Sequence, residues 1–156
     1  MTKKIIAITF LTLIVLFSFP GCSSNSKTLD LDVFCDAVLN EIQYDDELAI
    51  LPERIASDYY DLSFDGLEDF RIYVSGTAAT SNELAIMKLA DSNAVKMAED
   101  AIKTRINDQT NTYGNYRPDE VFRLESALIV KKDLYILFSV SNHNEEIEKI
   151  FNDSFK

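Results

Sequence analysis

The sequence predicts an α+β domain in which a four-stranded, mainly antiparallel sheet carries its helices on one face. Three observations support this class. Two pairs of strand-like apolar segments are each joined by a short connection, helical periodicity occurs before, between and after these pairs, and the chain of 156 residues has room for one ordinary domain. The expected element order is α-β-β-α-β-β-α.

Residues 1–21 have the features of a signal peptide. Lys3 and Lys4 give a positive start, and the apolar run from Ile5 to Phe19 ends at Pro20-Gly21. A membrane-spanning helix needs about 20 apolar residues, which is longer than this run. A signal peptide needs only a charged start, a short apolar middle and a small residue before the cut. We therefore expect residues 1–21 to be removed.

The stretch Phe19-Pro20-Gly21-Cys22 resembles a lipobox, the cleavage site of bacterial lipoproteins. The resemblance implies that Cys22 becomes the mature N-terminus and carries a diacylglycerol, with palmitate as a typical acyl chain. Two acyl chains anchor a protein stably to a membrane. We expect a lipid anchor on the extracytoplasmic face of the cell membrane. Ordinary secretory cleavage near Gly21 and an uncleaved anchor are the alternatives.

The first half of the mature chain is expected to form a tether, a helix and a strand. Residues 22–28 are polar and form the tether, and residues 29–156 form the single domain. Apolar residues at helical spacing predict a helix over 29–42. An acidic, turn-rich segment with a short helix near Arg54 follows, and alternation over 70–74 predicts a half-buried strand.

The second half is expected to supply three further strands and two helices. The small-residue loop 76–81 leads to a strand over 83–90. Asp91 or Ser92 then caps a long helix that ends at Gly114. Two strands, 127–131 and 134–140, join at Lys132-Asp133, and a closing helix follows them. The inner stripe of the long helix is Val95, Ala98, Ile102, Ile106, Gln109 and Tyr113.

Charge and cysteine content exclude several classes of function. The chain holds 15 Lys+Arg against 26 Asp+Glu, and removal of Lys3 and Lys4 leaves 13 − 26 = −13. Such a surface repels phosphate groups, so we expect neither nucleic acid binding nor electrostatic docking on anionic lipid. With Cys22 lipidated, Cys35 has no partner for a disulfide. It lies on the apolar face of the first helix, where a buried cysteine behaves as a small hydrophobe.

No motif for catalysis or for a metal site is complete. Residues 61–72 place Asp61, Ser63, Asp65 and Gly66 as in a calcium loop, but the twelfth position, which requires a bidentate glutamate, is Ile72. We expect an acidic turn before a strand. His143 is the only histidine, and no motif places a nucleophile near it. We therefore expect no cofactor, no metal and no recognisable catalytic residue.

A polar line on the long helix and one loop are the candidate contact sites. Arg105, Gln109 and Tyr113 follow one another at one helical turn, and a polar group on an inner face needs a hydrogen-bond partner. That partner is either the segment around Tyr116, the Gly76 loop or a bound molecule. The candidate ligand or partner contacts are therefore Gly76, Thr77, Arg105, Gln109 and Tyr116, with ordinary packing as the alternative.

The segments "YVSGTAATSNELAIMKL", "RINDQ" and "YRPDEVFRLESALIVKKDLYILFSVS" resemble a family of bacterial lipoproteins described as domain of unknown function 4358. The family commonly has a glycine in the last hairpin, where this chain has Lys132-Asp133. The resemblance implies a lipoprotein and this order of elements, but no activity. The positions that fit are Tyr73, Ser75, Gly76, Ala79, Glu83, Ala85, Lys88, Arg105, Gln109, Tyr116 and Pro118.

These observations favour a binding module at the cell envelope that holds a partner protein or a small ligand near the membrane. Two alternatives stay open: an envelope hydrolase whose site has no recognisable motif, and a structural accessory subunit. A cleft that brings together Arg105, Gln109 and Tyr116 would favour ligand binding, whereas one exposed apolar patch would favour a protein partner.

Overall fold

The computed structural model describes residues 28–156. The predictions that concern residues 1–21, Cys22 and most of the tether lie outside the described residues. Within residues 28–156, no helix is both long enough and apolar enough to cross a membrane.

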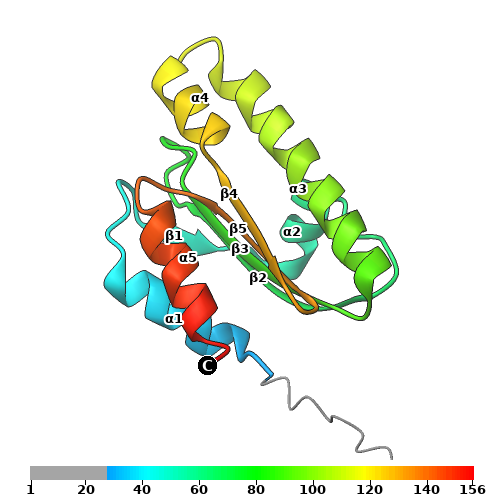
Figure 1. Cartoon of the computed structure of the whole chain (residues 1–156). Coiled ribbons are helices and arrows are strands. Elements are labelled where there is room, and N and C mark those ends of the chain that lie inside the picture. Colours follow the sequence, from blue (N-terminus) through cyan, green and yellow to red (C-terminus); the bar gives the residue numbers. More distant parts are fainter. Residues whose placement is uncertain (1–27) are drawn as a thin grey trace, which may run out of the picture.

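The described chain forms one antiparallel sheet of five strands, in the order β1-β2-β3-β5-β4, together with five helices (Figure 1). The α+β class is confirmed, but the predicted order and the count of four strands are wrong in detail. The elements are α1 (Leu31–Glu41), β1 (Leu48–Ile50), α2 (Glu53–Tyr60), β2 (Leu67–Ser75), β3 (Glu83–Leu89), α3 (Ser92–Tyr113), α4 (Pro118–Glu125), β4 (Leu128–Lys132), β5 (Tyr135–Val140) and α5 (Asn144–Asp153).

The extra strand β1 forms because β2 offers it backbone hydrogen-bond partners, and its own sequence does not predict a strand. It has only three residues, and Ala49 lies opposite Val74 of β2. The backbone amide of Gly76 donates to the Glu47 carbonyl at 2.8 Å, and that of Leu51 donates to the Ile72 carbonyl at 2.8 Å. A strand this short shows no alternation that a sequence pattern could detect.

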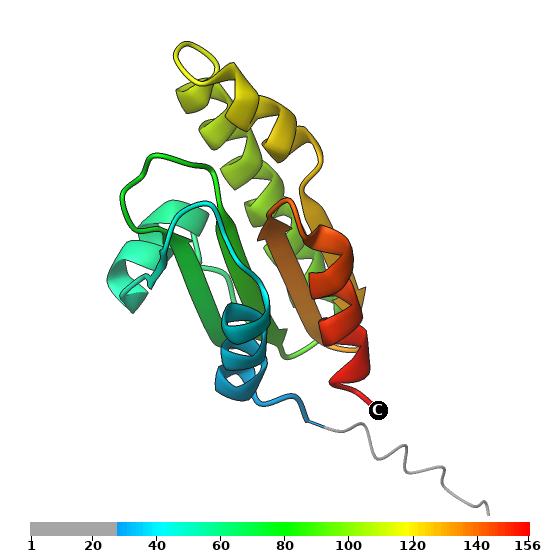
Figure 2. The same ribbon diagram turned by 90° about the vertical axis from the view of Figure 1, so that its left-hand side faces the viewer.

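Helices cover both faces of the sheet, so the prediction that they pack on one face is wrong. Helices α1 and α5 lie side by side on one face, and α2, α3 and α4 lie on the other (Figures 1 and 2). On β3, Leu84 and Ile86 point to the first layer, whereas Ala85 and Met87 point to the second. Strands buried on both faces read as continuous apolar runs, as "LAIM" and "YILF" do here.

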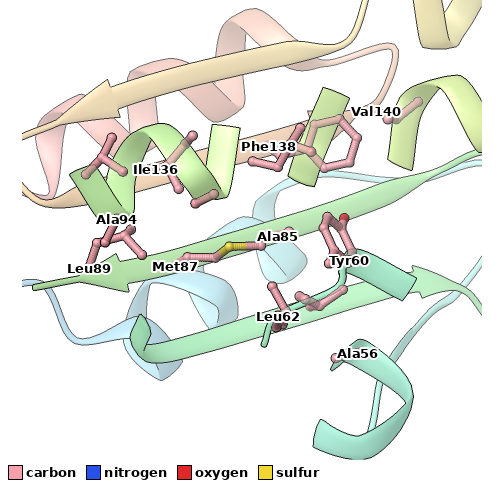
Figure 3. Packing of buried hydrophobic residues seen from close by; sticks show 14 of the residues in the cluster. Ala56, Tyr60, Leu62, Ala85, Met87, Leu89, Ala94, Ile136, Phe138 and Val140 are labelled. Carbon is pink, nitrogen blue, oxygen red and sulfur yellow. The ribbon is translucent and has the colours of Figure 1, made fainter. Parts of the chain in front are cut away.

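The long helix α3 agrees with its prediction at both ends. The Asp91 carboxylate caps it by accepting from the backbone amides of Asn93 and Ala94 at 2.9 Å, and Gly114 follows its last residue. Five of the six predicted stripe residues are buried, and Ile106 is half-buried against the same core. Figure 3 shows that core, in which the ring of Tyr60 packs edge-to-face on Phe138.

Of two local predictions, the burial of Cys35 is confirmed and the position of the last turn is wrong by one residue. Cys35 is buried in α1, as predicted, and burial raises the pKa of its thiol to about 12. The β4–β5 turn consists of Asp133 and Leu134, one residue later than predicted. Asp133 takes a φ of 52°, a left-handed conformation that aspartate tolerates better than most residues.

Candidate functional site

The candidate site lies where the first residue of β3 meets the second half of α3. Glu83 begins β3, and Arg105 and Gln109 stand one helical turn apart on the face of α3 that covers the sheet. Tyr60, the last residue of α2, approaches the same carboxylate from the core. Three side chains from two helices thus converge on one buried acid.

The Glu83 carboxylate is fully enclosed, with 0% exposure, and three side chains donate to it. Arg105 donates from Nη2 to Oε2 at 3.0 Å and from Nε to Oε1 at 3.2 Å. The Tyr60 hydroxyl donates to Oε1, and Gln109 Nε2 donates to Oε2. A buried charge of this kind is tolerable only with a paired charge and saturated hydrogen bonds, and both are present.

The electrostatics of the cluster keep each donor in its donating form. Burial disfavours the charge on Arg105, but the Glu83 carboxylate outweighs this effect and raises the pKa of the guanidinium. Burial and the negative charge of Glu83 raise the pKa of Tyr60 well above its usual value, so the phenol stays protonated. The Tyr59 ring lies 4.5 Å from Arg105 Cζ and adds a cation–π contact.

Gln109 leaves one strong acceptor without a partner. Its side-chain nitrogen must face Glu83, because an amide oxygen placed against a carboxylate would repel it. Oε1 therefore points away from Glu83, where it is buried and accepts no hydrogen bond from the described residues. The residue is 6% exposed. Leaving a buried acceptor unsatisfied costs about 1–3 kcal/mol, so this oxygen lowers the stability that the cluster contributes.

A cavity of about 210 Å³ lies beside this cluster. Glu83, Arg105 and Gln109 form part of its wall, and the rings of Tyr113 and Tyr116 form another part. Tyr116 is 60% exposed, and its ring lies 5.6 Å from that of Tyr113. The cavity is thus polar at its inner end and aromatic towards solvent.

The loop between β2 and β3 borders the cavity and is held from several sides. Ala78 lines the cavity in a left-handed conformation with a φ of 57°, which is strained for a residue with a Cβ. The Tyr113 hydroxyl donates to the Thr80 carbonyl at 2.6 Å. The backbone amide and the hydroxyl of Ser81 both donate to Glu120 Oε2 at 2.7 Å.

Comparison with known protein families gives a match. A family described as domain of unknown function 4358 matches residues 43–141, more than half of the chain. The chain belongs to this family. No curated protein and no solved structure matches it significantly. The matched range runs from the residues before β1 to the end of β5, so this 4358 domain contains the whole cavity and the buried carboxylates of Glu83 and Glu120.

The structure brings together only some of the candidate contact residues that the sequence indicated in this 4358 domain. Arg105, Gln109 and Tyr116 line one cavity. Gly76 and Thr77 are not in its wall. Gly76 permits β1 to approach, since a Cβ there would lie 3.0 Å from the Glu47 carbonyl oxygen. The Thr77 hydroxyl donates to Asp46 Oδ2 at 2.5 Å.

The partner of Gln109 is Glu83, and neither Tyr116 nor the Gly76 loop takes that place. Sequence reasoning missed Glu83 and Tyr60 as site residues, although Glu83 is among the positions that fit the family. One feature of the sequence indicates Glu83: it is a carboxylate at the head of the apolar run "LAIM". A charge at the start of a fully buried strand requires a buried cation, and Arg105 is that cation.

The remaining sequence candidates lie elsewhere in this 4358 domain. Ile72, at the twelfth position of the calcium-like loop, is 1% exposed in β2 and belongs to the core. Among residues 28–156, no group of three or more acidic, histidine or cysteine side chains is arranged to hold a metal ion. His143 stands before α5 with Nδ1 3.7 Å from Glu146 Oε1, and it does not line the cavity.

Proposed function

We propose that this protein is a lipid-anchored binding module on the extracytoplasmic face of the bacterial cell membrane, and that the cavity beside Gln109 holds a small ligand. One observation carries the ligand half of the proposal. Arg105, Gln109 and Tyr116 line one cavity of about 210 Å³, which is polar at its inner end and aromatic towards solvent. A concave site that combines aromatic walls with a few polar groups is typical of small-ligand sites.

The cavity is well placed for a protein that is anchored through Cys22. The backbone amide of Leu29 donates to the Tyr135 hydroxyl at 3.1 Å, at the end of the sheet where Tyr135 pairs with Lys88. Glu83 stands at the other end of β3, about 17 Å away at 3.3 Å per residue. The chain enters at one end of the sheet, and the β2–β3 loop lies at the other (Figure 1). An anchor on Cys22 would leave the cavity at the end remote from the membrane.

Two further observations favour a small ligand over the alternatives. Both Glu83 oxygens accept hydrogen bonds from protein donors, so this carboxylate is not free to act as a general base for a hydrolase. Exposed large apolar side chains occur on both faces of the sheet, such as Val33 on α1 and Phe122 on α4. They do not single out one docking face for a partner protein.

Labelling with an alkyne analogue of palmitate tests the anchor. We expect the intact chain and the Cys35→Ala variant to incorporate the label, because Cys35 is a core residue of α1. The Cys22→Ala variant should incorporate none. Mass spectrometry should find the N-terminus of the mature protein at a modified Cys22. Label on Cys22→Ala, or residues 1–21 still attached to the mature chain, would contradict the anchor.

Ligand retention tests the cavity. The full chain is purified from its own membranes and denatured, and the released small molecules are identified by mass spectrometry. We expect a compound in preparations of the unchanged chain and of Phe122→Ala, which alters an exposed side chain outside the cavity wall. The compound should be absent from Tyr116→Ala, which removes an exposed ring from the cavity wall and leaves the buried cluster around Glu83 intact. Equal recovery from all three proteins, or no compound from any, would contradict ligand binding in the cavity.

A further inference from the structure

We propose that the cavity holds an uncharged amide, which accepts hydrogen bonds through its carbonyl oxygen from Arg105 and from the hydroxyl groups of Tyr59 and Tyr116. This proposal rests on the proposed ligand-binding function and names the class of ligand. The free donors, the charge, the acceptors and the volume of the cavity each restrict that class.

Three groups in the cavity wall have protons to donate and no acceptor among residues 28–156. Arg105 donates to Glu83 through Nε and Nη2, which leaves Nη1 free. The hydroxyl groups of Tyr59 and Tyr116 line the same cavity and are also unpaired. A guanidinium and two phenols thus offer protons to one space, and a complementary ligand presents an acceptor there.

The ion pair turns its positive end towards the cavity. The Glu83 side chain is enclosed, whereas part of the Arg105 side chain stays exposed. The Tyr59 ring covers one face of the guanidinium, with its centre 4.5 Å from Cζ. A guanidinium donates its protons in its own plane, so this ring leaves the edge that carries Nη1 available to a ligand.

The charge of the surroundings favours a carbonyl oxygen over a carboxylate. Glu83 already balances Arg105, and the described residues that line the cavity include no second cation. Hydrogen bonds from Ser75 and Thr77 lower the pKa of Asp46, which keeps a negative charge directly behind the wall. The chain as a whole carries a formal charge of −11. These charges repel an anion, whereas a carbonyl oxygen is an acceptor without net charge.

Two hydroxyl oxygens in the wall can accept a proton from the same ligand. The Thr112 hydroxyl donates to the Asp108 carbonyl at 2.8 Å, and the Tyr113 hydroxyl donates to the Thr80 carbonyl at 2.6 Å. Each hydroxyl has used its only proton and keeps acceptor capacity on its oxygen. An amide has an N–H group beside its carbonyl, so it can donate to one of these oxygens while it accepts from Arg105. Ketones and esters lack that proton.

The volume of the cavity limits the rest of the ligand to about one ring. The cavity measures about 210 Å³, and a dry cavity of about 150 Å³ is known to hold one benzene molecule. The remaining space suits a carboxamide group on such a ring. The rings of Tyr113 and Tyr116 are tilted by 41° to each other and supply aromatic contacts on the solvent side.

An NMR titration of the full-length lipoprotein tests the class of ligand. The protein is held in amine-oxide micelles, and the backbone amide signals of Ala78 and Thr80 report on the cavity that both residues line. The probes are benzamide, benzoate, methyl benzoate and benzyl alcohol, which share one ring and differ in the attached group. We expect benzamide to shift both signals saturably and to bind about fivefold more tightly than each other probe. Every Kd refers to the free probe concentration, because uncharged probes partition into micelles.

Two substitutions remove the proposed donors and keep the aromatic rings. Tyr59→Phe and Tyr116→Phe each delete one hydroxyl group at an exposed position, where we expect no effect on folding. Each should weaken the binding of benzamide about fivefold, as expected for one neutral hydrogen bond. Tyr73→Phe is the matched control, because it deletes a hydroxyl group on the face of the sheet that packs against α1 and α5. It should leave binding unchanged.

The outcomes separate this proposal from the function on which it rests. Tighter binding of benzoate than of benzamide, with loss in Tyr59→Phe and Tyr116→Phe, would overturn the amide class and support the binding function. Equal binding of benzamide and methyl benzoate would show that the N–H group is not used, which also overturns the amide. Equal binding of benzamide by all three variants, or no saturable shift with any probe, would overturn the amide class at this site. The retention experiment decides the binding function independently, because it identifies whatever compound the protein carries.

Discussion

Replacement of Glu83 by alanine is expected to lower the free energy of unfolding by about 3–5 kcal/mol, because it strands a buried cation. The Arg105 side chain is mostly enclosed, and its hydrogen bonds to protein acceptors go to Glu83. The same substitution removes the acceptor for the Tyr60 hydroxyl and for the Gln109 amide. Three buried donors would lose their partner in one change. Denaturant unfolding measures the effect.

A double replacement distinguishes the loss of a partner from the loss of packing. Glu83→Leu combined with Arg105→Met removes both charges and keeps apolar volume, so it should recover much of the lost stability. Asp100→Ala is the surface control: its carboxylate is exposed and lies 4.0 Å from Lys103, a pair worth about 0–1 kcal/mol. A cost below about 1 kcal/mol for Glu83→Ala would show that the cluster does not stabilise the fold as described.

The local elements of this fold could be predicted because their causes are local. The stripe on α3 depends on residues three and four apart, and its cap depends on Asp91 alone. Alternation over 70–74 was enough to place β2. The element that had no local cause was missed: β1 exists because β2 offers it backbone partners. The sequence of three residues shows no alternation from which this pairing with β2 could be predicted.

The arrangement of the sheet could not be predicted from the same patterns. Two tight strand pairs suggested two hairpins with helices on one side. In the structure, β3 lies between β2 and β5, so the two hairpins join into the single antiparallel sheet that was predicted, with β3 and β5 both inside it. Both central strands are then covered twice, which their continuous apolar runs had indicated. The runs were interpreted as ordinary strands because their neighbours were unknown.

The candidate site was predicted only in part, because spacing along one helix does not show which strand residue lies beneath it. Helical spacing alone placed Arg105 and Gln109 on one face, and the need for an inner partner followed from the stripe. The identity of that partner depended on which end of β3 lies under α3. This is a question of register and topology that spacing on one helix does not answer. Glu83 was therefore visible in the sequence as a buried charge, but its contacts were not.

Helix α4 shows a missed element with a clear sequence signature. Pro118 stands at its first turn, and Asp119 and Glu120 follow in the turn where acidic residues are favoured. The segment was interpreted as a connection after Gly114. The helix is short and amphipathic, with Glu120 and Leu124 buried beneath it. Glu120 is 1% exposed, so a residue that resembles a solvated charge in the sequence is a second enclosed acid.

Glu120→Ala is expected to cost about 1–3 kcal/mol and to loosen the loop that borders the cavity. Glu120 accepts from Arg123 Nη1 at 2.9 Å and from Arg117 Nη2 at 3.0 Å. Its Oε2 also holds both the amide and the hydroxyl of Ser81. The substitution would therefore leave a buried backbone donor unpaired. Each of the two guanidinium groups would lose one acceptor, while Arg117 keeps Asp119 and Arg123 keeps Asp45. Faster hydrogen exchange at the Ser81 amide should accompany the loss of stability.

Glu125→Ala is the matched control, because Glu125 ends the same helix in an exposed position. It should change stability by less than about 0.5 kcal/mol and leave exchange at Ser81 unaltered. Glu83→Ala provides the second comparison, since it removes a buried acid that does not bind Ser81. If the increase in exchange rate at Ser81 matches the loss in free energy of unfolding equally in both variants, then Glu120 stabilises the whole fold and does not separately fix the loop. A larger rise in Glu120→Ala at matched stability would show that α4 sets the position of the cavity wall through this one carboxylate.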